Sequence, residues 1–157
     1  LDSLPSGYKA FTGVDLGTRD TKSSDLTVLF TICLHPSGDA EVLNIESGRW
    51  TSPDIMARIM DVHTRYKSMV LIEDTSAQDY IRQNLARQTA VPVFPFHTDH
   101  RKRDPIYGVE GLAVQMFNRK WIIPSNGGRC APEVERWIEE MLFYNPEAHT
   151  GDRLMAS

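Results

Sequence analysis

Residues 8–17 have the sequence YKAFTGVDLG, an apolar stretch that ends at an acid and a glycine. The pattern predicts a strand over Tyr8–Leu16, in which Phe11, Gly13 and Asp15 share one face because side chains alternate along a strand. An acid then lies at the end of a core strand, and Gly17 is typical of the tight turn that follows. Asp15 alone is equally compatible with a residue that begins a loop and caps a backbone N–H.

Two more strands are predicted directly after this one. Leu26–His35 is a run of β-branched and apolar residues, and Ala40–Ile45 is a second such run. Residues 36–38, Pro-Ser-Gly, are a turn sequence between them. The first three strands are therefore expected to form an antiparallel meander.

The remaining chain alternates helical and extended patterns. Ser52, followed by Pro53 at the first helical position, predicts the cap of a helix that ends near Tyr66. Met69–Ile72 is a short, wholly apolar run, which is typical of a strand buried in the middle of a sheet. Periodicity predicts further helices over Ser76–Ala86, Pro105–Asn118 and Pro132–Tyr144, and extended segments over Val91–Phe96 and Trp121–Ile123. This order predicts an α/β fold, with a central mixed β-sheet (an antiparallel meander plus parallel strands) and helices on both faces.

Size and composition are typical of one globular domain. The chain has 157 residues, of which 41% are hydrophobic and 24% are charged, and residues 1–157 are expected to form a single domain. No apolar run approaches the roughly 18 residues that a membrane span needs, so no membrane partner is expected. Cys33 and Cys130 stand alone, which predicts neither a zinc site nor a disulfide framework and favours a reducing, cytoplasmic setting.

A second acidic position follows the buried run, in the sequence VLIED. In a continuing strand Glu73 and Asp74 point to opposite faces, so only one of them is expected to reach a shared site. A helix-capping role before Ser76 accounts well for Asp74 and less well for Glu73. Glu73 is therefore the preferred ligand, and Asp74 is kept as an alternate.

A third acid, Asp152, occurs in HTGDRLMAS, where it begins a helix. Capping is the simplest explanation of Asp152 taken alone. Asp25, in the polar segment after the first strand, is a further and weaker candidate for the same site.

Together, these separated acids predict a metal-dependent nuclease. Grouped carboxylates repel one another and usually need cations to neutralise them, and hard oxygen ligands suit Mg²⁺ or Mn²⁺. The net charge of −4 does not exclude a DNA partner, because phosphate contact depends on local cations. The sequence HTDHRKR, residues 97–103, supplies them in His100, Arg101, Lys102 and Arg103, although it can also be read as a solvated loop.

Three motifs carry a resemblance to a known family. GVDLGTRDTKSSDLTVLF, VLIEDTSAQDYI and HTGDRLMAS resemble the motifs of the ribonuclease H superfamily, and more closely those of the C-terminal nuclease domain of the large terminase subunit of tailed bacteriophages. The first motif matches the family at Asp15 and often at Asp25. The third commonly has paired aspartates, and here Gly151 takes the first place of that pair. The family's basic residue before a helix has a match within residues 101–103.

The resemblance implies a ribonuclease H-like endonuclease that cuts concatemeric viral DNA during genome packaging in the host cytoplasm. It implies two Mg²⁺ or Mn²⁺ ions about 3.5 to 4 Å apart, bridged by Asp15, with Glu73 and Asp152 on either side. The expected partners are double-stranded DNA, an N-terminal packaging ATPase domain before Leu1, the portal protein and the small terminase subunit. No Walker-type GxxxxGK[ST] occurs in this chain, in agreement with an ATPase domain elsewhere.

Other interpretations remain open. The opening GVDLGTRDTKSS also resembles the first phosphate loop of the actin, chaperone and sugar-kinase superfamily, but no second glycine-rich phosphate loop is present. A non-catalytic DNA-binding or motor-docking module is a further alternative, as are transposases and junction resolvases of the same superfamily.

Overall fold

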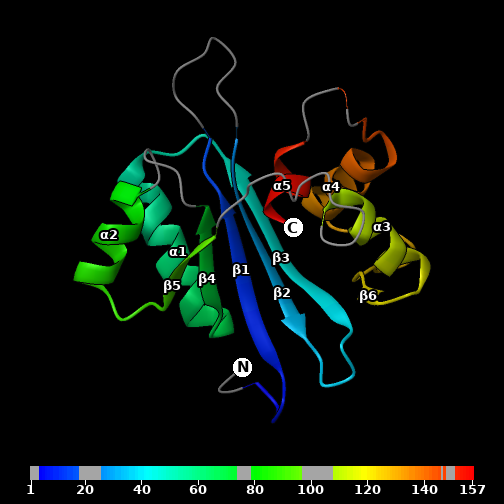
Figure 1. The fold of residues 1–157 in the computed structure, drawn as a ribbon, viewed down its shortest axis with the longest axis horizontal. Helices are drawn as coiled ribbons and strands as arrows, with labels where there is room; N and C mark the ends of the chain where they lie inside the picture. Colours follow the sequence, from blue (N-terminus) through cyan, green and yellow to red (C-terminus); the bar gives the residue numbers. More distant parts are fainter. Residues whose placement is uncertain (1–3, 18–25, 74–78, 97–107, 146, 148–150) are drawn as a thin grey trace.

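A six-stranded sheet forms the centre of the computed structural model, which describes residues 4–17, 26–73, 79–96, 108–145, 147 and 151–157. The strand order is β5-β4-β1-β2-β3-β6 (Figure 1). The strands are β1 (Lys9–Asp15), β2 (Thr27–Leu34), β3 (Ala40–Gly48), β4 (Met69–Glu73), β5 (Val93–Phe96) and β6 (Trp121–Ile122).

The sheet is mixed, as the sequence predicted. β1 pairs antiparallel with β2, and β2 pairs antiparallel with β3, which confirms the meander. β4 lies parallel to β1 on its other side, and β5 lies parallel to β4. β6 lies parallel to β3 at the far edge. The carboxyl ends of β1, β4 and β5 therefore meet at one end of the sheet.

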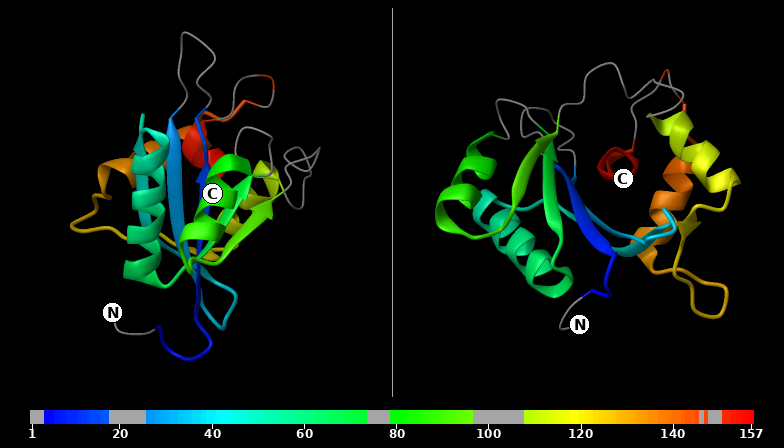
Figure 2. Two further views of the ribbon diagram at one scale, coloured as in Figure 1. Left: turned by 90° about the vertical axis from the view of Figure 1, so that its left-hand side faces the viewer. Right: turned by 60° about the horizontal axis from the view of Figure 1, so that its bottom comes forward.

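Helices cover both faces (Figure 2). One face carries α1 (Ser52–Tyr66) and α2 (Asp79–Gln88), and the other carries α3 (Val109–Phe117), α4 (Pro132–Leu142) and α5 (Asp152–Ala156). No helix in the described ranges is both long and apolar enough to cross a membrane.

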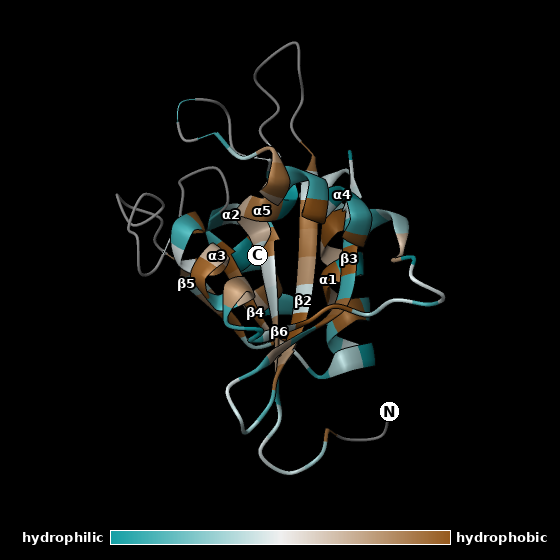
Figure 3. Cartoon of the chain, turned by 90° about the vertical axis from the view of Figure 1, so that its right-hand side faces the viewer, coloured by the Kyte–Doolittle hydropathy of each residue, from teal (hydrophilic) through white to brown (hydrophobic). Residues whose placement is uncertain are grey.

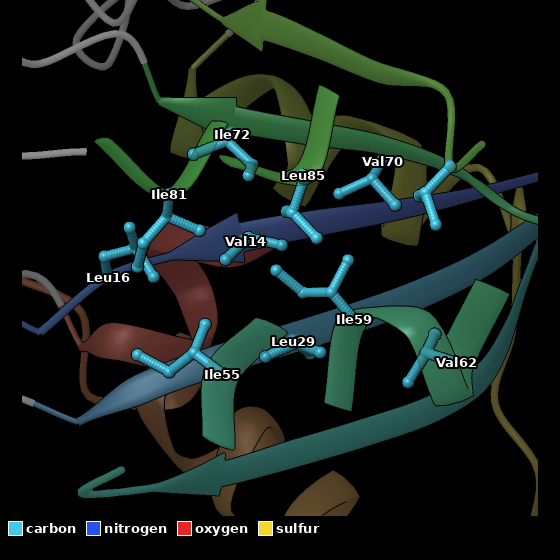
Figure 4. Packing of buried hydrophobic residues seen from close by; sticks show 11 residues of the cluster. Val14, Leu16, Leu29, Ile55, Ile59, Val62, Val70, Ile72, Ile81 and Leu85 are labelled. Carbon is cyan, nitrogen blue, oxygen red and sulfur yellow. The ribbon is translucent and has the colours of Figure 1, made fainter. Parts of the chain in front are cut away.

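Each face has its own core. Beneath α1 and α2, buried side chains of β1, β2 and β4 meet those of the two helices (Figure 4). On the other face, Phe30 of β2 packs edge-on against Trp137 of α4, with ring centroids 4.8 Å apart. Trp121 packs against this second core and Trp50 against the first, so all three tryptophans are packing residues.

Several predictions about element ends were wrong. Helix α2 ends at Gln88 rather than Ala86, α4 ends at Leu142 rather than Tyr144, and β5 begins at Val93 rather than Val91. The N-cap of α1 is Thr51 rather than Ser52, because Thr51 has the extended backbone of a cap and its Oγ1 accepts a hydrogen bond from the Asp54 N–H at 3.4 Å. Strand β3 continues three residues past Ile45, to Gly48, because pairing with β2 persists to Thr27 although the apolar pattern has ended.

Candidate active site

Asp15 and Glu73 end two neighbouring parallel strands. Val14 of β1 is in register with Ile72 of β4, and both side chains are buried beneath α1 and α2. Because side chains alternate along a strand, the next residue of each strand, Asp15 or Glu73, points to the opposite face. Both acids are half-buried. The two strands thus place two carboxylates on one face, at their carboxyl ends.

Helix α5 packs on that same face. A Cβ added to Gly13 would lie only 2.3 Å from the backbone oxygen of Ala156, so the missing side chain lets α5 contact β1. The helix also contacts β2, and it carries hydrophilic residues followed by hydrophobic ones (Figure 3). Since Gly13 and Asp15 share a face, α5 lies on the side of the sheet to which Asp15 points.

Asp152 lies at the start of α5, close to the beginning of β2. Its Oδ2 accepts a hydrogen bond from the backbone N–H of Leu26 at 3.1 Å, a contact across 126 positions of sequence. Leu26 immediately precedes β2, and Asp15 is in register with Val28 of that strand. The carboxylate therefore binds the start of β2 rather than an N–H of its own helix. Asp152 is thereby placed at the same end of the sheet as Asp15.

The donor chemistry of this end of the sheet suits a divalent cation. Asp15, Glu73 and Asp152 offer only carboxylate oxygens, which are the ligands that Mg²⁺ and Mn²⁺ prefer. Within the described part of the chain, no three His, Cys, Asp or Glu side chains are grouped around a common point where they could hold an ion. The residue types thus fit a metal, and binding would require the carboxylates to draw together.

The other predicted site residues cannot be placed. The alternate ligands Asp74 and Asp25 lie outside the described residues, and so do the predicted DNA-binding residues His100 and Arg101, Lys102, Arg103.

Sequence reasoning missed a buried arginine beside the site. Arg153, only 6% exposed, directly follows Asp152. Its Nε donates to Glu133 Oε2 at 2.8 Å, its Nη1 to Glu140 Oε1 at 2.8 Å, and its Nη2 to Ser47 Oγ at 3.0 Å. These contacts join α5 to α4 and β3. No local sequence pattern predicts these contacts, because the residues that bind Arg153 lie on other elements.

The charges in this cluster support one another. Burial opposes the ionisation of Glu133, but hydrogen bonds from Arg153 and Ser47 outweigh it, so the pKa of Glu133 lies below its usual value. Burial likewise opposes the charge of Arg153, and the bonds to Glu133 and Glu140 raise its pKa nonetheless. Glu133 and Arg153 are therefore both ionised at neutral pH.

Comparison with known proteins gives no match to a family model or to a curated protein. Solved structures do match. The large terminase nuclease from the thermophilic phage G20c superposes with a TM-score of 0.62 at 16% identity, over 99% of this chain and 81% of that one.

The yeast mitochondrial Holliday junction resolvase Ydc2 superposes with a TM-score of 0.54 at 11% identity, over 93% of this chain and 75% of that one. The fold predicted from the motifs is thus confirmed: this chain has the ribonuclease H-like fold found in a phage terminase nuclease.

Proposed function

We propose that the chain is the nuclease domain of a phage large terminase subunit, and that it hydrolyses phosphodiester bonds of concatemeric viral DNA during packaging. One observation carries this proposal. Asp15, Glu73 and Asp152, from three separate elements, lie at the same end of the sheet on a fold similar to a terminase nuclease over 99% of this chain. Three carboxylates at one end of a sheet are the donors that a divalent cation prefers, and a cation would offset their mutual repulsion as they draw together around it.

The chain's own residues would hold and orient the ions. Asp15 ends β1, which lies between β4 and β2, so its carboxylate would be the ligand between Glu73 and Asp152. The Leu26 N–H donates to Oδ2 of Asp152, which would hold that carboxylate in place as a ligand for an ion. Bound Mg²⁺ or Mn²⁺ would supply an activated water and stabilise the charge on the leaving oxygen.

The DNA and protein partners are also proposals. We infer that His100 and the basic residues Arg101, Lys102 and Arg103 contact the phosphate backbone, because phosphate contact needs local cations and the chain as a whole is acidic. An N-terminal packaging ATPase, the portal protein and the small terminase subunit are the further partners that the motif resemblance supports, acting in the host cytoplasm.

Junction resolution is a second candidate, favoured by the likeness to the yeast mitochondrial resolvase. One experiment separates the two. Supercoiled plasmid and a synthetic four-way junction are each incubated with the chain in EDTA, Mg²⁺ or Mn²⁺, beside Asp15→Asn. A terminase nuclease should nick and linearise plasmid, require metal and Asp15, and show no preference for the junction.

The same experiment can overturn the proposal. A strong preference for the junction would indicate a resolvase. Absence of cutting by a folded chain with every metal would indicate a binding or docking module. Nucleotide binding would instead favour the ATP-binding interpretation.

A further inference from the structure

The start of α5 is capped by a side chain from another helix. Gly151, its N-cap, has no side chain to accept a hydrogen bond. The N–H of Leu154, at the third helical position, donates instead to Glu140 Oε2 of α4 at 2.9 Å. An N-cap side chain ordinarily accepts from the second or third helical N–H. Glu140 therefore performs the role that residue 151 would otherwise have.

Glu140 also fills the space that a side chain at position 151 would occupy. A Cβ on Gly151 would lie 2.3 Å from Oε2 and 2.4 Å from Cδ of Glu140. The backbone of Gly151, with φ −60° and ψ 146°, is open to any residue, so what opposes a larger residue here is the contact with the Glu140 side chain. The carboxylate cannot turn aside freely, because its other oxygen accepts from Arg153.

We propose that Glu140 and Arg153 form a clamp that positions Asp152 at the acidic end of the sheet, an inference that rests on the proposed nuclease function. Helix α5 has five residues, too few to be stable alone. The clamp fixes both its first turn and the residue directly after Asp152. Glu140 and Arg153 are thus positioning residues. Gly151 departs from the paired aspartates of the resembled motif because Glu140 occupies the position of that side chain.

The test moves the cap from one residue to the other. Glu140→Ala removes it, Gly151→Ser alone places a side chain against Glu140, and the double variant offers a serine cap in the vacated space. Glu139→Ala, the exposed neighbour on α4, is the matched control. Two readouts are used: amide hydrogen exchange at Leu26 and Leu154, and the Mn²⁺ concentration that gives half-maximal plasmid cleavage. The Leu26 amide reports directly on Asp152, which accepts its hydrogen bond.

Each single variant should speed exchange at both amides and raise the required Mn²⁺ concentration about 10- to 100-fold. The double variant should recover most of the exchange protection and most of the Mn²⁺ affinity, and Glu139→Ala should match the wild type in both. Serine adds no carboxylate, so such recovery would come from the restored position of Asp152 and not from a new metal ligand. If Glu140→Ala does not fold, Glu140→Gln serves instead. It keeps an oxygen for Leu154 and should show a smaller change in the same direction.

The clamp is overturned if Glu140→Ala leaves Leu26 exchange and the Mn²⁺ requirement unchanged, or if the double variant recovers neither. Failure of the wild type to cleave with any metal is a separate result, which rejects the proposed function. In that case exchange at Leu26 and Leu154 still decides the clamp. Faster exchange in both single variants and recovery in the double would support it, and any other pattern would reject it.

Discussion

At the scale of single residues, Gly13 determines how closely α5 approaches the acidic end of β1. A methyl group there would meet the backbone oxygen of Ala156 at 2.3 Å, and a backbone atom cannot rotate away. Gly13→Ala should therefore displace α5, destabilise the fold by about 1–3 kcal/mol, as overpacking does, and lower cleavage because Asp152 moves. Urea unfolding and plasmid cleavage measure the two effects. Wild-type stability and cleavage in this variant would mean that α5 does not lie on β1.

Single residues also show what sequence reasoning can find. Asp15 and Glu73 were identifiable because each follows an apolar strand, and alternation then fixes the face to which each points. Glu140 and Arg153 were not identifiable. Their pairing depends on how α4 and α5 meet, and neither helix has a periodicity that marks an inward charge. The glycine at position 151 was not predictable either, because it is explained by a contact with Glu140 on another helix.

At the scale of elements, the ion pairs between α4 and α5 make the junction sensitive to acid. The folded-state pKa of Glu133 is lowered from 4.5, so its contribution to stability is present above about pH 4.5 and is lost as the pH falls through the lower folded value. Arg153 stays charged throughout, because its pKa is raised. We expect the melting temperature to fall below about pH 4.5, and to fall less steeply in Glu133→Gln. Parallel pH profiles for the two chains would contradict this role of Glu133.

Element boundaries were predicted well where local chemistry sets them. Helix α1 ends at Tyr66 as expected, and the predicted strand Tyr8–Leu16 differs from β1 by one residue at each end. One error came where an element depends on its neighbour. Strand β3 runs beyond its last apolar residue because β2 continues to pair with it, and Thr51 rather than Ser52 adopts the capping conformation. Strand pairing is a tertiary property that one segment's sequence does not contain. The cap of α1 is local, since Thr51 Oγ1 accepts from the Asp54 N–H three residues on, and the prediction missed it because Thr51 and Ser52 are both residue types that cap helices.

At the scale of the whole molecule, a bound cation should stabilise the fold. The three acids come from β1, β4 and α5, so an ion that they share would link elements that separate on unfolding. A ligand that binds only the folded state, at 100 times its Kd, contributes about 2.7 kcal/mol. Mn²⁺ should thus raise the melting temperature of the wild type, and it should have little effect on Asp15→Asn. An equal rise in both chains would place the ion elsewhere.

The arrangement of the whole fold was also predictable, since a meander followed by alternating helices and strands leaves few topologies for a mixed sheet. What the sequence did not contain was the packing of α5 across β1 and β2, which places Asp152 at the same end of the sheet as Asp15 and Glu73.

We propose that Asp15, Glu73 and Asp152 act together as one metal-dependent site. The most direct test is the rate of plasmid cleavage in Mn²⁺ by Asp15→Asn, Glu73→Gln and Asp152→Asn, with Glu135→Gln, an exposed acid of α4, as the control. Each of the three variants should cleave plasmid more than about 100-fold more slowly than the wild type, while the control keeps the wild-type rate. A loss of about 100-fold is the upper limit for residues that only support a metal ligand. Cleavage at the wild-type rate by any of the three folded variants would contradict the assignment of that acid, and by Asp15→Asn would contradict the site as a whole.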